Sequence, residues 1–284
     1  MPQTKDIHVD TITDAVARMC IEAACDLPQD VEDALKRALN DEDSDLGLYA
    51  LNKVCENARM AREEGVPLCQ DTGMVVVFCE IGADVRIIGG LLEDAVNRGV
   101  ARGYTDGYLR KSTVVDPLFD RSNACDNTPA IVHVRFVEGD QIALTVLPKG
   151  AGSENMSALG MLKPAQGVDG VVRFVVDAVV RAGGNPCPPS VVGVGIGGNA
   201  EKALELSKEA LRREIGSSHP DSRYAELERR ILHELNATGI GPQGFGGTVT
   251  SLAVHIASYP THIAMLPVGV TINCHAARHK KVVL

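Results

Sequence analysis

The sequence has no tryptophan, few other aromatic residues and no long hydrophobic run. Aromatic residues make up only 4% of the 284 positions, so the core must consist mainly of Val, Ala, Leu and Ile. No stretch approaches the ~18 consecutive apolar residues that a membrane span requires. Residues 1–20 also lack the apolar segment of a secretory signal peptide. We therefore expect a cytoplasmic protein that does not enter a membrane.

Basic residues are outnumbered, which argues against nucleic acid as a partner. The chain has 28 Lys and Arg against 37 Asp and Glu, which gives a formal net charge of −9 and a pI near 5.4. Contacts to phosphate need a basic surface, and the sequence contains no basic cluster. If the substrate is an anion, a local group of Arg and Lys must overcome the negative field of the whole chain.

The hydrophobic pattern predicts an α+β fold. A mostly antiparallel sheet covered by helices is expected, in a single large domain over residues 1–284, because two pairs of strands are separated only by short turns. These predicted hairpins join 130–136 to 141–147, and 249–257 to 263–272. Further strands are predicted over 74–79 and 190–196. Helices are predicted over 28–39, 46–64, 91–100, 168–180, 201–215 and 222–236.

One glycine-rich segment imitates a nucleotide-binding motif. Gly193–Gly198 reads GVGIGG between a predicted strand and a predicted helix. A dinucleotide fold also needs an acidic residue ~20 positions on, at the end of a second strand. That position falls inside a charged helix here. We therefore interpret these glycines as permitting close backbone packing and a sharp entry into the helix.

Three of the eight cysteines differ from the other five. The chain has no Cys-x-x-Cys pair, which argues against a zinc ribbon or a thioredoxin-type site. Residues 1–66 are predicted to be mainly helical, and the cysteines within them are expected to be core thiols: Cys20, Cys25 and Cys55. Three others lie in Gly-, Pro- or polar-rich segments beside predicted strands, and are candidate metal ligands: Cys69 in PLCQDTG, Cys187 in NPCPP and Cys274 in TINCHAARH. Three thiolates would leave one iron of a [4Fe–4S] cluster open, whereas four would close the cluster for electron transfer.

Several other residues are candidates for binding or proton transfer. Lys149 opens KGAGSEN, which is either an anion-binding turn or a plain turn before a helix. Arg110 and Arg278 are candidate carboxylate-binding forks. His262, in a turn between strands, is a candidate for holding or protonating a substrate oxygen. Asp71 is either a catalytic carboxylate or the cap of an Asx turn.

Taken in order, five segments resemble the class I, iron–sulfur fumarate hydratase and L-tartrate dehydratase family. They are PLCQDTG, LPKGAGSEN, NPCPPSVVGVGIGG, GIGPQGFGG and YPTHIAMLPVGVTINCHAARH. The resemblance covers roughly residues 10–280 and is closest to the α-subunit. It departs from many relatives at Ala151, where a glycine is expected.

The resemblance implies an enzyme with a [4Fe–4S] cluster. Its ligands would be Cys69, Cys187 and Cys274, and the fourth iron would bind the hydroxyl that is added or removed. The substrate contacts that match the family are Gln70, Asp71, Arg110, Gly150 and His262, to which we add Lys149 from the anion-binding turn. The catalytic groups would be Asp71 and His262, with Asp71 moving the proton on the neighbouring carbon.

The same resemblance implies a separate β-subunit, a small dicarboxylate substrate and a homodimer formed through this chain. The expected reaction is the reversible hydration of fumarate to L-malate, as in the tricarboxylic acid cycle. Dehydration of L-tartrate to oxaloacetate is the alternative substrate assignment. A non-catalytic electron carrier would need a fourth thiolate, for which Cys79 or Cys125 are the candidates. A subunit without metal that acts as a scaffold is the third alternative.

Overall fold

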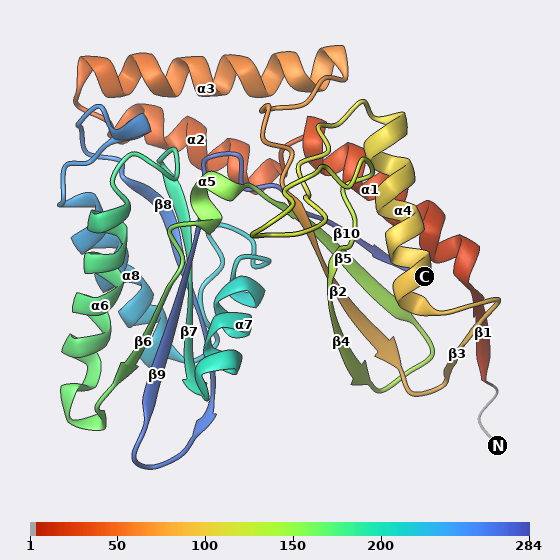
Figure 1. Cartoon of the computed structure of the whole chain (residues 1–284). Helices are drawn as coiled ribbons and strands as arrows, with labels where there is room; N and C mark the ends of the chain where they lie inside the picture. The colour runs from red at the N-terminus through yellow and green to blue at the C-terminus, as the bar shows by residue number, and fades with distance from the viewer. Residues whose placement is uncertain (1–3) are drawn as a thin grey trace. The chain divides into compact units, whose positions relative to one another are not determined.

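The structure, a computed structural model, describes residues 4–284 and confirms the α+β fold (Figure 1). Within the chain, which we expected to form one domain, contacts group into two compact units. Unit 1 comprises Met1–Pro28, Ala58–Ala151 and Arg278–Leu284. Unit 2 comprises Gln29–Asn57 and Gly152–Ala277. No helix among residues 4–284 is long and apolar enough to cross a membrane.

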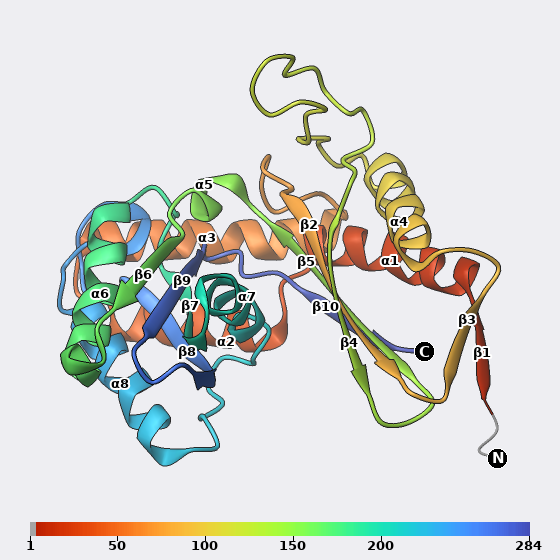
Figure 2. The same ribbon diagram turned by 60° about the horizontal axis from the view of Figure 1, so that its bottom comes forward.

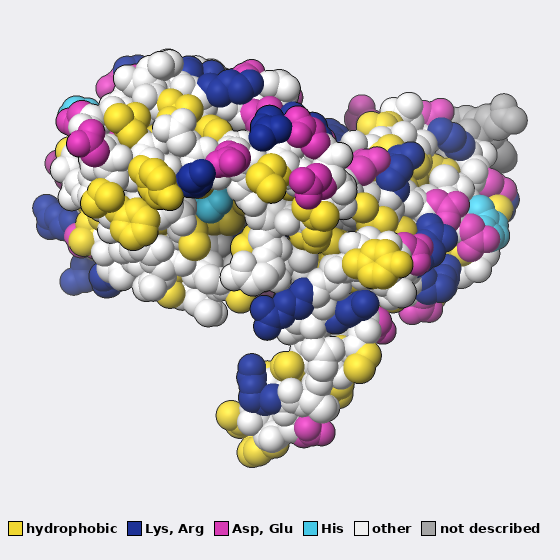
Figure 3. All heavy atoms as spheres, turned by 90° about the horizontal axis from the view of Figure 1, so that it is seen from above, with side chains coloured by type: hydrophobic (Ala, Val, Ile, Leu, Met, Phe, Trp, Pro, Cys, Tyr) yellow, Lys and Arg dark blue, Asp and Glu magenta, His cyan; other side chains and the backbone are white. Residues whose placement is uncertain are grey.

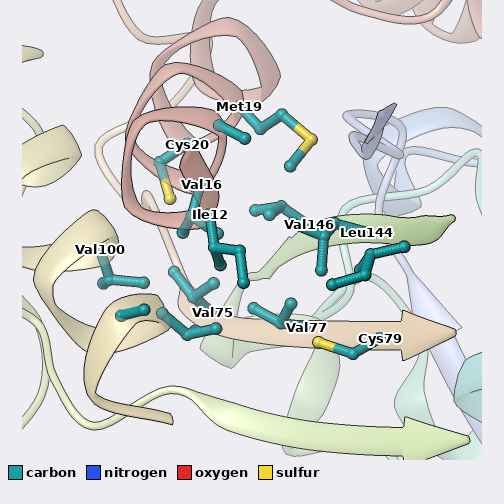
Figure 4. Packing of buried hydrophobic residues seen from close by; sticks show 14 of the residues in the cluster. Ile12, Val16, Met19, Cys20, Val75, Val77, Cys79, Val100, Leu144 and Val146 are labelled. Carbon is teal, nitrogen blue, oxygen red and sulfur yellow. The ribbon is translucent and has the colours of Figure 1, made fainter. Parts of the chain in front are cut away.

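Unit 1 is built on a four-stranded sheet. Its strand order is β10 (Lys280–Val283), β5 (Ile142–Lys149), β2 (Met74–Gly82) and β4 (Ile131–Val137). Helix α1 (Val9–Cys25) packs on this sheet and α4 (Leu92–Asp106) packs on α1. Figure 4 shows Ile12 and Val16 of α1 facing Val75 and Val77 of β2 in this core. A short parallel pair, β1 (Lys5–His8) with β3 (Val85–Ile88), completes the unit.

Unit 2 is built on a second four-stranded sheet between helices. The order is β6 (Ala158–Leu162), β9 (Leu266–Asn273), β7 (Ser190–Gly198) and β8 (Ser251–Thr261). Alternate residues of a strand point to opposite faces, and those of β7 contact different helices. Val192 and Val194 pack with α6 (Gly167–Ala182) and α8 (Ser222–Asn236), while Gly193 and Gly195 face α7 (Ala200–Ala210).

The remaining helices complete the described chain. Helix α2 (Gln29–Asp41) contacts β8, and α5 (Ala151–Glu154) is a single short turn. Helix α3 (Asp45–Glu64) begins one residue before the predicted range of 46–64, and its residues are divided between unit 2 and unit 1. Two 3₁₀ turns lie at Pro164–Gln166 and Pro242–Gly244.

Both predicted hairpins are wrong. Strand β2 lies between β4 and β5, and β7 lies between β8 and β9. Each four-stranded sheet is therefore mixed, with a parallel pair at one edge, β2 with β4 and β7 with β8. Strands that are apolar on both faces favour central positions, and β2 and β7 are the most continuously apolar strands. Burying β2 and β7 on both faces therefore outweighed the tendency of strands adjacent in sequence to pair with each other.

The glycine-rich segment Gly193–Gly198 packs against a helix, as predicted. A Cβ atom on Gly193 would lie 2.0 Å from the carbonyl oxygen of Ser207, and one on Gly195 would lie 2.0 Å from that of Ala203. Both carbonyls belong to α7. Because these glycines have no side chains, the α7 backbone can pack directly against β7. This close packing explains the glycines of the motif without a bound nucleotide.

We predict that Gly195→Ala destabilises the protein strongly, by at least ~3 kcal/mol, because main-chain atoms of α7 cannot move as a flexible side chain can. Gly139→Ala is the control, since a Cβ there meets no atom within 4 Å and only its φ of +108° is unfavourable. That strain costs about 1–2 kcal/mol. Chemical denaturation of both variants measures the difference. Equal losses of stability would contradict the packing role of Gly195.

Candidate active site

Cys69 and Asp71 lie in one tight turn of unit 1, just before β2. The Asp71 N–H points to the Cys69 sulfur at 3.4 Å, and the Gly73 N–H donates to Asp71 Oδ1 at 3.1 Å. The second contact is the Asx turn considered from the sequence. Gly73 has a φ of +80°, and a Cβ there would lie 2.7 Å from the Lys149 backbone. The turn therefore requires glycine at this position.

Buried side chains hold the carbonyl groups of this turn. The Arg278 guanidinium donates to the Asp71 carbonyl. The Tyr104 hydroxyl donates to the carbonyls of Thr72 and Gly73, at 2.7 and 3.1 Å. The Asn127 amide also donates to the Gly73 carbonyl, at 3.1 Å. Because each of these carbonyls has a fixed partner from another segment, the turn is held rigidly.

The 107–130 connection between α4 and β4 anchors to the same turn. It projects from unit 1 in Figure 2, and in Figure 3 it forms the lobe that bears Lys and Arg beside hydrophobic side chains. At its base, the Thr72 hydroxyl donates to the Arg110 carbonyl at 2.7 Å. The buried Asn127 Oδ1 accepts the N–H groups of Ser112 and Thr113. The structure thus brings the Arg110 backbone to the turn and leaves its side chain exposed.

Gly150 and Ala151 also meet Asp71. The Ala151 N–H donates to Asp71 Oδ2 at 2.7 Å, and a Cβ on Gly150 would lie 3.1 Å from the same oxygen. The Ala151 N–H of the predicted anion-binding turn is therefore occupied by Asp71. Lys149 is buried, with only 2% of its surface exposed, while Gln70 is exposed and its amide oxygen lies 3.4 Å from the Cys69 sulfur.

In unit 2 the structure brings together the segments that carry Cys187 and Cys274. The His275 N–H and Nδ1 lie 3.3 and 3.0 Å from the Cys187 carbonyl oxygen. Gln243, in the loop between α8 and β8, joins them. Its N–H and its side-chain amide both donate to the Pro188 carbonyl at 2.7 Å, and the amide lies 3.1 Å from His275 Nδ1. Sequence analysis did not assign Gln243 a role; its place in GPQGFGG was the only signal.

Glu42 anchors the loop that carries Gln243. Its carboxylate, in a side chain only 6% exposed, accepts the N–H groups of Asp43, Ser44, Thr248 and Val249 at 2.9–3.1 Å. A carboxylate that accepts four N–H groups fixes the backbone around it. The glycine-rich loop is therefore tied to the end of α2 within unit 2.

His262 lies apart from the Cys274 segment. It is exposed in the turn between β8 and β9, before β9 begins, whereas Cys274 directly follows the last residue of β9. Strand β9 has eight residues, so at ~3.4 Å per residue its ends lie roughly 25 Å apart. Within one copy of unit 2, the structure does not bring His262 to Cys274.

The core-thiol prediction is confirmed for Cys20 and Cys25, which are buried, and is wrong for Cys55, which is only partly buried. Cys20 is fully buried and Cys79 is 1% exposed, and burial raises the pKa of each thiol to about 12. Burial also raises the pKa of Cys25 and of Cys55. A thiol must lose its proton to bind a metal, so burial disfavours these four as ligands.

The three candidate ligands lie on loops, and each residue is at least partly exposed. Cys69 and Cys274 are partly exposed and Cys187 is exposed; the other exposed cysteine is Cys125, in the 107–130 connection. Within residues 4–284, no group of three or more His, Cys, Asp or Glu side chains surrounds a single metal-ion position. Cys69 belongs to unit 1, and Cys187 and Cys274 belong to unit 2. As donors, the three fit an iron–sulfur group, because they are accessible and one sulfur faces a main-chain N–H.

Comparison with known proteins decides the family. The family model described as "Fumarate hydratase (Fumerase)" matches residues 13–283. The chain belongs to this family. A Methanocaldococcus jannaschii protein, provisionally named L(+)-tartrate dehydratase subunit alpha, is 43% identical over 94% of this chain and 95% of its own length. The L(+)-tartrate dehydratase subunit alpha of Escherichia coli strain K12 is 33% identical over 96% of this chain and 91% of its own.

The family assignment confirms the resemblance seen in the motifs. The class I fumarate hydratase family consists of hydro-lyases, enzymes that add water across a carbon–carbon double bond or eliminate water to form one. The match covers the Cys69–Gly73 turn of unit 1 and also the Cys187, Gln243 and His275 network of unit 2. Membership therefore does not rest on one isolated motif.

We predict that Glu42→Gln destabilises this family member by ~2–4 kcal/mol, because a side-chain amide places N–H donors against main-chain N–H donors. Hydrogen exchange of a peptide covering residues 239–249 would rise in the variant. Glu63→Gln is the matched control, since Glu63 makes only an exposed i,i+4 pair with Arg59 and its loss should cost under ~0.5 kcal/mol. An unchanged exchange rate in Glu42→Gln would show that Glu42 does not hold the loop.

Proposed function

We propose that the chain is the α-subunit of a [4Fe–4S]-dependent hydro-lyase that interconverts fumarate and L-malate. The observation that carries the proposal is the pairing, in one fixed turn, of an accessible thiol with a carboxylate two residues away. Cys69, Cys187 and Cys274 would hold the cluster. When bound, such a cluster supplies an open iron that acts as a Lewis acid on a C–OH group.

Asp71 would hold or move the proton on the carbon next to the hydroxyl. Its two carboxylate oxygens accept N–H groups from Gly73 and Ala151, which fixes the orientation of the carboxylate. A fixed orientation is what proton transfer at one carbon requires. Gln70, Arg110, Lys149 and Gly150 would bind the dicarboxylate, with the two cations opposing the net charge of −9.

His262 would act on the site of a second copy of the chain. The far end of β9 from Cys274 is roughly 25 Å away, beyond the reach of a histidine side chain. A homodimer that sets the β8–β9 turn against the partner's cysteine loops would reconcile a catalytic His262 with this geometry. This requirement links two expectations from the family resemblance, the role of His262 and self-association.

A separate β-subunit would complete the enzyme. The relatives from M. jannaschii and E. coli are both named as alpha subunits, which supports this partner. The β-subunit would supply further positive charge for the second carboxylate of the substrate. We further propose a cytoplasmic location and, for fumarate as substrate, a place in the tricarboxylic acid cycle.

L-Tartrate, dehydrated to oxaloacetate, is the second candidate substrate, because the names of these relatives favour it. Malate and tartrate differ by one hydroxyl on the carbon from which Asp71 would take its proton. The same catalytic groups therefore serve either reaction, and specificity would depend on groups near this carbon.

The electron-carrier alternative is weaker. Its fourth thiolate would have to come from Cys79 or Cys125. Cys79 lies in the core of unit 1, where Figure 4 shows it on β2 among apolar side chains. Binding iron there would require the core to open. Cys125 is exposed, so it is the candidate fourth ligand by which the electron-carrier alternative is tested. The metal-free scaffold is tested separately, by whether the chain binds iron.

We predict that anaerobic reconstitution loads about four iron and four sulfide per chain. Cys187→Ser should abolish loading and activity, while Cys125→Ser, the matched exposed control, should retain both. Iron and sulfide analysis with electron paramagnetic resonance measures the outcome. Loss of the cluster in Cys125→Ser would favour the electron carrier. No cluster in the unaltered chain would favour the scaffold.

We predict further that the complex reconstituted with its β-subunit hydrates fumarate at least tenfold faster, in kcat/KM, than it dehydrates L-tartrate. Steady-state rates on both substrates, from one preparation, provide the comparison. A preference of the same size for L-tartrate would replace fumarate by tartrate and leave the hydro-lyase chemistry in place.

A further inference from the structure

Arg278 is a buried guanidinium with an unused hydrogen-bond donor. Only 2% of its surface is exposed. One terminal nitrogen donates to the Asp71 carbonyl, and Nε makes a long hydrogen bond of 3.4 Å to the Pro148 carbonyl. The other terminal nitrogen, Nη1, is buried and has no hydrogen-bond partner among residues 4–284.

Such an arrangement is costly unless an acceptor arrives from outside the chain. Arginine stays charged at all relevant pH values, and a buried charge is stable only when it is paired or fully hydrogen-bonded. The two carbonyl groups that Arg278 contacts carry no formal charge. Asp71, the carboxylate of this turn, already accepts N–H groups on both oxygens.

Lys149 adds a second buried cation to this region. Its side chain is 2% exposed, and its backbone lies against Gly73. Arg278 and Lys149 together outweigh the charge of Asp71. Arg278 and Lys149, which both contact the backbone of this turn, are both cations, which favours an anion beside it.

We infer that Arg278 is an anion-binding and positioning group of the Cys69–Gly73 turn. It holds Asp71 through the main-chain carbonyl, and its Nη1 donates to an anionic acceptor bound beside the turn. The inference rests on the proposed function for the identity of that acceptor, which is either a sulfur of the cluster or a carboxylate of the substrate. Both present the same chemistry, a negatively charged acceptor for a guanidinium N–H.

The first experiment needs no iron. Thermal unfolding of the iron-free chain is followed with and without malate, for the unaltered protein, Arg278→Lys, Arg278→Gln and Arg62→Gln. Arg62 is the matched control, because it also donates to a main-chain carbonyl of unit 1, that of Leu27. Malate should raise the Tm of the unaltered chain and Arg62→Gln and should not raise that of Arg278→Gln. Equal shifts in all four would count against a carboxylate as the acceptor.

The second experiment uses the anaerobically reconstituted complex and separates the two acceptors. If Nη1 binds the substrate, Arg278→Lys should raise KM for malate on the order of 10- to 100-fold, with the cluster signal unchanged in the absence of malate. If Nη1 binds the cluster, the paramagnetic signal should change without substrate. Arg278→Lys preserves the charge and serves if Arg278→Gln does not fold.

A normal KM and an unchanged signal in Arg278→Lys and Arg278→Gln, together with equal thermal shifts, would overturn the inference, since Nη1 would then face only water. If instead the proposed function were wrong, the two experiments would give a different combination of results. In that case the unaltered complex would lack iron or turnover, whereas the iron-free thermal shift would still report whether Arg278 binds an anion.

Discussion

The candidate site depends on the hydrogen bonds that hold the carbonyl groups of the Cys69–Gly73 turn. Arg278, Tyr104 and Asn127 come from three separate segments and donate to three successive carbonyls. A turn of this kind would otherwise sample several conformations and lose entropy on binding a ligand. Held by buried donors, it presents the Cys69 sulfur and the Asp71 carboxylate in one orientation. Preorganisation of this kind lowers the cost of binding and of proton transfer.

Unit 2 uses the same physical solution with different residues. The Cys187 carbonyl joins the Cys187 and Cys274 segments, because the main-chain N–H and the ring Nδ1 of His275 both lie beside it. Gln243 holds the carbonyl of the following proline. Glu42 fixes the loop that carries Gln243. In each unit, therefore, hydrogen bonds from other segments to main-chain carbonyl groups hold a loop that carries a candidate cysteine.

Sequence reasoning predicted the helices and the enzyme class better than the sheet. The helical pattern located α8 at its observed bounds and α3 to within one residue, and the setting of Cys69, Cys187 and Cys274 distinguished them from the buried Cys20 and Cys25. Strand order could not be predicted, because it depended on which strand gained most from burial on both faces. The short strands β1, β3, β6 and β10 have too few alternating residues to give a signal. Gln243 was visible only as a member of a motif, and Arg278 was expected to bind a carboxylate but not to hold the turn, since both contact carbonyl groups far away in the sequence.

The central claim is that the turn and the cysteine loops hold a cluster with one iron open to substrate. The most direct measurement is the paramagnetic resonance spectrum of the reconstituted, reduced complex with malate carrying ¹⁷O at its hydroxyl. The account predicts line broadening relative to unlabelled malate, because the labelled oxygen would bind the open iron. The claim would be contradicted if labelled and unlabelled malate gave the same line width and the fourth iron were bound by a protein side chain.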